Sequence, residues 1–432
     1  MSKVVVIGGG WAGCGAAIAA AKAGAEVVLL ERTDMLLGTG LAGGYMRNNG
    51  RYTAAEEAIA MGAGELFGVT DAVALNTNVD MPHHKHGSMY NVFTIEPEVR
   101  KAVLGAGVDI RLEARFRDVK MDGNRITAVL DDNGNVYEAD TFVDCTGTTG
   151  SQANCTKYGN GCCMCVLRCP TFGNRVSVAA KAGVKERMVE RPGGFGAFSG
   201  ACEIPKECLA PEIVAELEEK GSLVIPLAPE LIDAHKLDIK ACKQYSAKEF
   251  AENLVILHNG YAKLVTPYFP LEKLRQVPGF EKARFEDPYS GSQGNSIRYL
   301  AIAPRDNTMK VEGVDNLFCG GEKGGSYVGH TEAICTGSVG GLNAARYAMG
   351  LEPVELPRDT VIGDIIAYAR EEMVKPGGMT VRFTFAGEGF FKRMKERGMY
   401  TTDGEAVSKR VADLGLTGYF NRRVAGGNRQ TA

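Results

Sequence analysis

The sequence has little net charge, no hydrophobic run long enough to cross a bilayer, and no segment resembling a secretory signal. Its 49 Lys and Arg residues nearly balance 52 Asp and Glu residues, so the chain as a whole has no attraction to nucleic acid or to an anionic membrane. No apolar run approaches the roughly 20 residues of a membrane-spanning helix. The first apolar run continues directly into a glycine-rich turn, which is typical of a core strand and not of a signal peptide. We therefore expect a cytoplasmic protein without a membrane partner.

Features of a secreted, disulfide-rich protein are also missing, although the chain contains 12 cysteines. At 432 residues it exceeds one ordinary hydrophobic core and should form two or more subdomains. In a chain of this length without a secretion signal, we interpret the cysteines as thiols, ligands or core residues rather than as a disulfide scaffold.

The clearest positive feature is a glycine-rich turn near the N-terminus. Residues 4–7 form a short β-branched run, and Gly8, Gly10 and Gly13 then complete the pattern G-x-G-x-x-G before an alanine-rich helix. A second predicted strand ends at Glu31, 18 residues beyond Gly13. In such a turn the first glycine permits the bend, the second lets the backbone approach a pyrophosphate, and the third allows close packing of helix on sheet. A carboxylate at Glu31 can accept both ribose hydroxyls, so the pattern predicts an adenine dinucleotide site.

Further strands and a helix are predicted from apolar patterns and turn signals. Residues 108–145 alternate apolar and polar positions between strong turn signals, which predicts a small antiparallel β-meander. The meander leads into a buried strand that ends at Thr146-Gly147. Far downstream, residues 316–319 form another strand that runs into glycines at 320–321, and a helical stretch follows from Thr331 to about Met349.

The order of these elements resembles that of the glutathione-reductase-type FAD flavoproteins with a single dinucleotide site, and most of all their GidA-like branch. That branch includes tRNA-modifying flavoproteins and folate-dependent tRNA uracil methyltransferases. The resemblance rests on the glycine turn and on a closing motif that occupies residues 320–325, 329–333 and 340–346. It covers about residues 1–150 and 295–350, and the glycine turn alone is shared with very many flavoproteins.

The resemblance implies an α/β fold in which FAD lies along the carboxyl edge of a parallel sheet. The N-terminal dipole of the helix that begins at Thr331 would then face the N1/C2 edge of the flavin. In one respect the chain departs from the pattern, because Glu322 stands where the tRNA-modifying branch usually has glutamine. The residues expected to bind FAD are Gly8, Gly10, Gly13, Glu31, Arg32, Thr146, Gly147, Gly321, Glu322 and Thr331.

The sequence lacks a second G-x-G-x-x-G that follows a strand, so no separate nicotinamide-binding domain is predicted. The electron donor would have to be transiently bound NAD(P)H, a carrier protein or thiols. We expect four segments: the first part of the FAD-binding domain at 1–154, an inserted cap or substrate domain at 155–294, the last part of the FAD-binding domain at 295–350, and a helical C-terminal extension at 351–432.

A cysteine cluster within residues 155–169 has no counterpart in the resemblance and admits three interpretations. Its C-x2-C-x3-C-P spacing overlaps the tail of a ferredoxin run, which would allow a [4Fe-4S] cluster with a fourth ligand. Alternatively, Cys162 and Cys165 form a C-x-x-C redox pair whose thiol pKa Lys157 or Arg168 would lower. The third interpretation is that the cysteines are packed and inert. No second C-x-x-C or histidine pair stands at zinc-ligand spacing, and no metal site is predicted.

Other candidate residues have a structural interpretation as well as a functional one. His330 directly precedes the helix that should meet the flavin, where it would serve in proton transfer or only hold the turn. The run His83-His84-Lys85-His86 is interpreted as a solvated loop, with contact to an anionic substrate as the alternative. Lys323 would stabilise a reduced flavin or face solvent. From Arg370 onward 12 Lys or Arg residues stand against 7 Asp or Glu residues, which would suit tRNA phosphates but fits a solvated helix face better.

The sequence therefore predicts an FAD-dependent oxidoreductase that transfers electrons or hydride through flavin N5. Cys162, Cys165 and His330 are its candidate catalytic residues, and its substrate would be a small molecule or a thiol. The alternative is a folate- and FAD-dependent tRNA-modifying methyltransferase, with tRNA as the partner. A third interpretation is a flavin-binding scaffold without catalysis.

Overall fold

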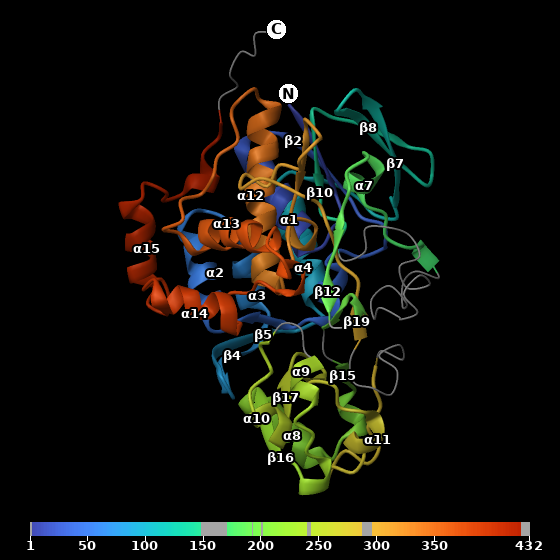
Figure 1. The fold of residues 1–432 in the computed structure, drawn as a ribbon, viewed down its shortest axis with the longest axis vertical. Helices are drawn as coiled ribbons and strands as arrows, with labels where there is room; N and C mark the ends of the chain where they lie inside the picture. Colours follow the sequence, from blue (N-terminus) through green and yellow to red (C-terminus); the bar gives the residue numbers. More distant parts are fainter. Residues whose placement is uncertain are drawn as a thin grey trace.

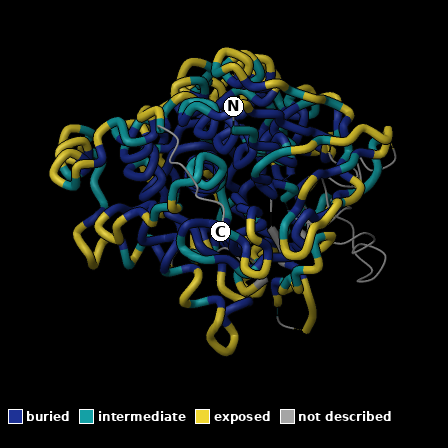
Figure 2. Tube along the Cα trace, turned by 90° about the horizontal axis from the view of Figure 1, so that it is seen from above, coloured by how far each residue is buried: buried dark blue, intermediate teal, exposed yellow. Residues whose placement is uncertain are grey.

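The computed structural model describes residues 2–147, 171–191, 193–199, 202–239, 243–286 and 296–424. Figure 1 shows two parts, a larger α/β body and a smaller sheet-containing cap at one end. Buried residues fill the centre and exposed residues form the rim (Figure 2). The predicted α/β class is confirmed.

A five-stranded parallel sheet forms the centre of the α/β body. Its order is β21 (Leu317–Cys319), β10 (Thr141–Asp144), β1 (Lys3–Ile7), β2 (Glu26–Leu30) and β6 (Asp109–Arg111). The β-branched run at 4–6 has no exposed surface, as expected of a central strand covered on both faces. The carboxyl ends of β1, β2, β10 and β21 therefore meet at one edge of the sheet.

Two helices pack closely against each other beside this sheet. They are α1 (Trp11–Ala23) and α12 (His330–Ala348), which lie side by side in Figure 1. A Cβ atom on Gly337 would overlap the carbonyl oxygen of Ala12, and one on Gly341 would overlap that of Ala16. These glycines therefore allow the backbones to touch, which brings the N-termini of α1 and α12 to the same edge of the sheet.

The predicted β-meander is present as β7 (Phe116–Asp122), β8 (Arg125–Asp131) and β9 (Val136–Glu138), paired in that order. The start of the predicted region differs, because residues 109–111 form β6 and join the parallel sheet instead. This strand follows a helix, α4 (Ile95–Gly105), and such a crossover returns the chain in the parallel direction.

The cap contains a four-stranded antiparallel sheet and its own hydrophobic core. The order is β15 (Cys202–Ile204), β18 (Ala262–Leu264), β17 (Asn253–His258) and β16 (Ser222–Pro226), with α8 (Pro211–Lys220) packed against β16 and β17. A three-stranded sheet connects cap and body: β3 (Tyr45–Arg47), β5 (His84–Tyr90) and β4 (Ala74–Met81). The shorter elements are α7 (Val178–Lys181), α9 (Lys236–Ile239), α10 (Glu249–Glu252), α11 (Leu271–Leu274), β11 (Arg187–Met188), β12 (Glu190–Arg191), β13 (Gly194–Phe195), β14 (Ala197–Ser199), β19 (Ser296–Arg298) and β20 (Ala301–Ile302).

The C-terminal extension is helical, as predicted. Helices α13 (Val361–Met373), α14 (Glu388–Glu396) and α15 (Gly404–Asp413) lie on the side of the body that carries α2 (Gly50–Ala60) and α3 (Glu65–Ala72) (Figure 1). Glu57 of α2 accepts hydrogen bonds from the backbone N–H groups of Val361 and Ile362 at 3.0 and 2.9 Å, which caps α13. Among the described residues, no helix is long and apolar enough to span a bilayer.

The prediction of a solvated histidine loop is wrong for one of its residues. The segment is a hairpin in which His83 is exposed and His86 is half-buried, but His84 begins β5 and is buried. Nδ1 of His84 lies 2.7 Å from the Asn48 amide nitrogen, and Nε2 lies 2.7 Å from the Gln244 carbonyl oxygen. Its neighbours predict a neutral ring that accepts at Nδ1 and donates at Nε2. His84 thus joins the body to the cap.

This histidine predicts an acid-sensitive junction. Burial lowers the pKa of His84 to about 4, against the smaller opposing effect of its hydrogen bond to Gln244. The histidine is protonated more readily in the unfolded chain, where its pKa is about 6.5, than in the folded protein. Protonation below pH ~6.5 therefore favours unfolding. The stability that neutral His84 contributes is complete above pH ~6.5 and is lost as the pH falls toward about 4. We expect a loss of about 3 kcal/mol across this window, measured by urea unfolding.

The matched comparison is His84→Gln against His83→Gln. Burial raises the pKa of Glu57 to about 7, so Glu57 costs stability as pH rises through much of the same window, and only the difference between variants isolates His84. His84→Gln should remove the histidine's part of the pH dependence, whereas His83→Gln should keep the wild-type profile. Identical profiles for all three proteins would contradict the assignment.

Candidate functional site

A pocket opens at the carboxyl edge of the parallel sheet, where β1, β2 and β10 end. Its walls come from the glycine turn, the end of β2, the start of β7, and a segment after residue 170. The lining residues are Ile7, Gly8, Gly10, Leu30, Glu31, Arg32, Thr33, Leu37, Gly38, Thr39, Ala114, Arg115, Phe116, Cys145, Thr146, Gly147, Arg175, Val176 and Glu322.

The three glycines of the turn serve different purposes. Gly8 has φ +101°, and a Cβ atom there would overlap the Cys145 carbonyl group. A Cβ atom on Gly13 would overlap the carbonyl oxygen of Gly8, so Gly13 lets α1 approach the strand. Among the described residues, a Cβ atom on Gly10 would have one atom within 4 Å, the Leu37 carbonyl oxygen at 4.0 Å, and Gly10 has φ −70°. The protein's own packing therefore does not require glycine at position 10, and the space beside it belongs to the pocket.

The carboxylate of Glu31 is fixed at the end of β2. One oxygen accepts a hydrogen bond from the Gly9 N–H at 2.8 Å, and the other accepts one from the Thr33 N–H at 2.9 Å. Each carboxylate oxygen can accept a further hydrogen bond, so the buried group can still receive hydroxyl donors from the pocket. Together with the N-terminus of α1, which begins directly after Gly10, this arrangement fits a ribose and a pyrophosphate.

The opposite wall is held by Asp144 at the end of β10. Its Oδ1 accepts hydrogen bonds from the Thr146 N–H at 3.0 Å and from the Thr146 hydroxyl at 2.7 Å. Gly147 follows with φ +79°, and a Cβ atom there would meet none of the described residues within 4 Å. The Thr-Gly pair therefore turns the chain beside the pocket.

The structure brings seven of the ten predicted FAD-binding residues into the lining of this pocket. They are Gly8, Gly10, Glu31, Arg32, Thr146, Gly147 and Glu322. The other three pack nearby: Gly13 against Gly8, Gly321 through a 2.9 Å hydrogen bond from its N–H to Thr336, and Thr331 through a 2.8 Å bond to the Met46 carbonyl oxygen. Arg115 and Arg175 also line the pocket, and the sequence did not single them out because neither belongs to the glycine motif.

The N-terminal turn of α12 carries a buried ion pair. Glu332 and Arg51 are almost fully buried, and the Nε of Arg51 lies 3.0 and 3.1 Å from the two Glu332 oxygens. Glu332 also accepts hydrogen bonds from the Thr384 hydroxyl at 2.7 Å and the Phe385 N–H at 2.8 Å. Burial alone would lower the pKa of Arg51, but the Glu332 carboxylate raises it above its usual value. The pair thus ties α2, α12 and the C-terminal extension together at the helix end expected to face a flavin.

His330 belongs to an aromatic cluster beside that helix end. Its ring centroid lies 6.0 Å from those of Trp11 and Tyr90. The Tyr90 oxygen lies 2.6 Å from the Gly40 carbonyl oxygen, to which it donates, and 3.1 Å from Nδ1 of His330. Because the hydroxyl proton is used on Gly40, the geometry predicts that Nδ1 of His330 carries the proton and donates it to the Tyr90 oxygen.

The cap contacts the glycine-rich loop that covers this cluster. Lys263 donates hydrogen bonds to the Ala42 carbonyl oxygen at 2.7 Å and to Glu203 at 2.8 Å. On the other side of the loop, a Cβ atom on Gly43 would overlap the His330 ring. Residues 42–43 are therefore held between the cap and His330.

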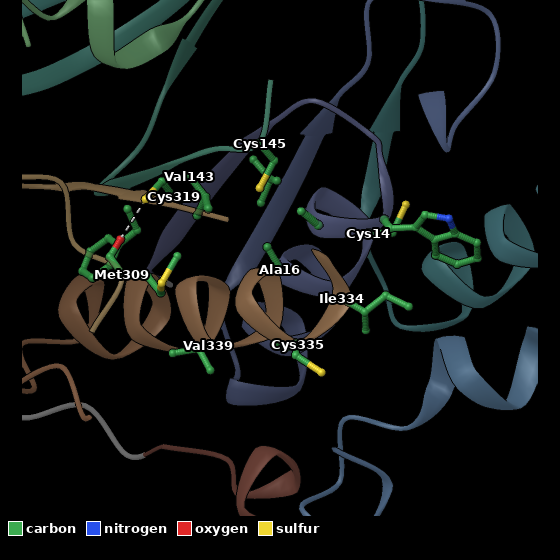
Figure 3. Packing of buried hydrophobic residues seen from close by; sticks show 14 of the residues in the cluster. Cys14, Ala16, Val143, Cys145, Met309, Cys319, Ile334, Cys335 and Val339 are labelled. Carbon is green, nitrogen blue, oxygen red and sulfur yellow. Dashed lines mark hydrogen bonds between the residues drawn. The ribbon is translucent and has the colours of Figure 1, made fainter. Parts of the chain in front are cut away.

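The two predicted redox cysteines, Cys162 and Cys165, and the rest of the cluster at 155–169 lie outside the described residues. Within the described ranges, Cys14, Cys145, Cys319 and Cys335 are buried among apolar side chains (Figure 3). Burial raises the thiol pKa of each of them, that of Cys319 to about 12. These four thiols behave as core residues. In the part of the chain that the structure describes, no group of three or more His, Cys, Asp or Glu residues could hold a metal ion.

The interpretation that Lys323 faces solvent is wrong. Its side chain is fully buried and forms an ion pair with Glu186. Its Nζ also donates hydrogen bonds to Ser177 Oγ at 2.9 Å and to the Ala301 carbonyl oxygen at 3.0 Å. The lysine therefore fastens the segment after residue 170 to the body, which a pattern of neighbouring glycines cannot reveal.

Family comparisons agree with this geometry at the level of the fold and cofactor class. The family model described as FAD dependent oxidoreductase matches residues 3–150, and the model described as Glucose inhibited division protein A matches residues 249–352. The second match extends the resemblance into the cap strands β17 and β18. Aquifex aeolicus GidA in its form II crystal superposes with a TM-score of 0.65 at 16% identity, covering 95% of this chain and 76% of that chain, and this supports the fold alone.

Curated relatives match over shorter segments. The tRNA uridine 5-carboxymethylaminomethyl modification enzyme MnmG of Thermus thermophilus is 29% identical over 26% of this chain and 19% of its own length. The methylenetetrahydrofolate–tRNA-(uracil-5-)-methyltransferase TrmFO is 38% identical in Symbiobacterium thermophilum, over 22% of this chain and 20% of that protein. TrmFO of Enterococcus faecalis is 31% identical over 32% of this chain and 31% of its own length. The matches therefore span between a fifth and a third of these relatives.

Proposed function

We propose that this chain, which resembles the GidA-like branch of the FAD-dependent flavoproteins, binds FAD and modifies a uridine base of tRNA. The observation that carries the cofactor assignment is the pocket beside Gly10, where the protein's packing leaves the glycine's open side to a ligand. The substrate assignment rests on the relatives, whose names describe two different modifications of uridine or uracil in tRNA. This supports the tRNA-modifying alternative over the oxidoreductase with a thiol relay.

Each residue of the site has a defined task in this proposal. Gly8, Gly10 and the N-terminus of α1 would hold the pyrophosphate, and Glu31 would accept the ribose hydroxyls. Bound FAD would supply electron or hydride transfer, or carry a one-carbon unit. His330 would take part in proton transfer beside the N-terminus of α12, with Tyr90 next to its Nδ1. The cap at 155–294 would cover the substrate, because its Lys263 already contacts the loop next to His330.

Cofactor binding can be measured with the chain's single tryptophan. Trp11 directly follows Gly10 and is almost fully buried, so FAD in the pocket should quench its fluorescence by energy transfer. Titration of the apoprotein with FAD should give a saturable decrease, and riboflavin, which lacks the adenosine and pyrophosphate, should give a much smaller one. Equal responses to the two compounds would contradict binding through the dinucleotide pocket.

The proposed substrate is tested with an unmodified tRNA transcript and the FAD-loaded protein. Reactions with methylenetetrahydrofolate and a reductant, followed by mass spectrometry of the nucleosides, should reveal a uridine carrying additional mass. A hairpin RNA of the same composition serves as the control. The same reaction is repeated with glycine in place of the folate. If the tRNA nucleosides keep their masses with both donors, the proposed tRNA-modifying function is wrong. The fluorescence titration tests FAD binding independently of this result.

A further inference from the structure

Positive charge in the pocket would add to what the glycine turn offers a pyrophosphate. A pyrophosphate carries two negative charges, whereas the turn offers backbone N–H groups and the partial positive charge of a helix end. No charged side chain occurs in the first turn of α1, which reads Trp11-Ala12-Gly13-Cys14. Two acids, Glu31 and Glu322, also line the pocket and add negative charge. Among the described lining residues, the cations are three arginines.

Arg32 and Arg115 hold a backbone segment at the pocket, next to Arg175. Arg32 donates a hydrogen bond to the Gly173 carbonyl oxygen. Arg115 donates to the Asn174 carbonyl and side-chain oxygens, each at 2.7 Å, and forms an ion pair with Asp132. Their guanidinium groups therefore fix residues 173–174 at the mouth of the pocket.

The same segment is fixed again directly after Val176. The Ala179 N–H donates to Asp144 Oδ2 at 3.0 Å, and the buried Ser177 hydroxyl accepts hydrogen bonds from Ala180 N–H at 3.2 Å and from Lys323 at 2.9 Å. Asp144 is the residue whose other oxygen holds Thr146, so this anchor and the Thr-Gly wall share one carboxylate. Arg175 lies between the two anchors, and its side chain lines the pocket with 8% of the residue exposed.

We propose that Arg175 is a cofactor-binding residue whose guanidinium pairs with the pyrophosphate of FAD. The inference rests on the proposed binding of FAD in this pocket. A nearly buried guanidinium pairs strongly with a phosphate, because both charges are shielded from water and the planar group can donate two parallel hydrogen bonds. The backbone of Arg175 is anchored on both sides before the ligand binds. Binding therefore does not carry the entropy cost of ordering this backbone. The segment that leaves the cysteine-rich region would thus contribute directly to holding the cofactor.

The test compares Arg175→Gln with Arg117→Gln, an exposed arginine of the adjacent strand β7 that is absent from the pocket lining. Quenching of Trp11 reports FAD binding to the apoprotein, and competition with ADP and with adenosine separates the phosphates from the base. We expect Arg175→Gln to weaken FAD and ADP by about 10- to 100-fold and to leave adenosine unchanged. Arg117→Gln should bind all three as the wild type does.

Three outcomes would overturn the proposal in distinguishable ways. Unchanged binding of FAD and ADP by Arg175→Gln would show that Arg175 does not contact the phosphates. An equal loss for ADP and adenosine would assign Arg175 to stacking on the adenine instead. A wild-type protein that binds neither FAD nor ADP would remove the proposed FAD site together with this inference. If Arg175→Gln does not fold, Arg175→Lys, which keeps the charge without the planar fork, should still weaken ADP relative to adenosine.

Discussion

Replacing Gly10 with valine should abolish most FAD binding while the protein still folds. The pocket side of Gly10 is open, and its φ of −70° is allowed for any residue, so the native packing can accommodate the new side chain. The valine methyl groups would instead occupy the space of the pyrophosphate. An overlap of this kind costs about 1–3 kcal/mol, which corresponds to a loss of affinity of about 5- to 150-fold. The flavin absorbance of the purified protein and the Trp11 quenching titration both measure this effect.

Two other glycines provide the controls for this experiment. Gly68 in α3 is exposed and has no neighbour within 4 Å of a Cβ position, so Gly68→Val should leave FAD binding unchanged. Gly8→Val should instead lower the yield of folded protein, because its side chain would overlap the Cys145 carbonyl group. Wild-type affinity in Gly10→Val would show that the dinucleotide does not pass beside Gly10.

The second large effect concerns the buried pair of Arg51 and Glu332. Removing one partner leaves a charge buried without its counter-ion, and such changes cost about 3–5 kcal/mol. We therefore expect Arg51→Met to lower the free energy of unfolding by about that amount, with an accompanying loss of the contacts from Arg51 to the Val328 carbonyl oxygen and Thr384. Urea unfolding followed by circular dichroism measures the change.

A double-mutant cycle separates the pair from its surroundings. The variant Arg51→Met/Glu332→Leu should be less destabilised than the sum of the two single variants, since it leaves no unpaired buried charge. Arg111→Met removes one partner of the exposed Arg111–Asp109 pair and should cost less than about 1 kcal/mol. Single variants that unfold at the same urea concentration as Arg111→Met would contradict the assigned role of the buried pair.

This pair also bears on how the proposed site works. Glu332 would place an uncompensated negative charge at the N-terminus of α12, the end expected to stabilise an electron-rich flavin edge. Arg51 neutralises that charge and uses both oxygens of the carboxylate. The net charge near the helix end is therefore close to zero, and the backbone N–H groups remain the polar feature of this end.

The sequence by itself determined the parts of the protein that depend on local pattern. The β-branched run, the glycine turn and the acid at a fixed distance predicted β1, α1, β2 and the position of Glu31. The closing glycines predicted β21 and α12. These predictions succeed because strand, turn and helix signals lie within a few residues of each other and each has one local physical cause. The same signals named seven of the pocket's lining residues.

Only the tertiary structure decided which distant side chains meet. Arg51 and Glu332 are separated by 281 positions in the sequence, and Arg175 reaches the pocket because Arg32, Arg115 and Asp144 hold its segment in place. Burial of His84 and Lys323 likewise depends on elements far along the chain, which is why their local surroundings predicted exposed residues. Hydrophobic periodicity and turn chemistry specify elements, whereas pairing between buried charges follows from how those elements pack, and that information is spread over the whole chain.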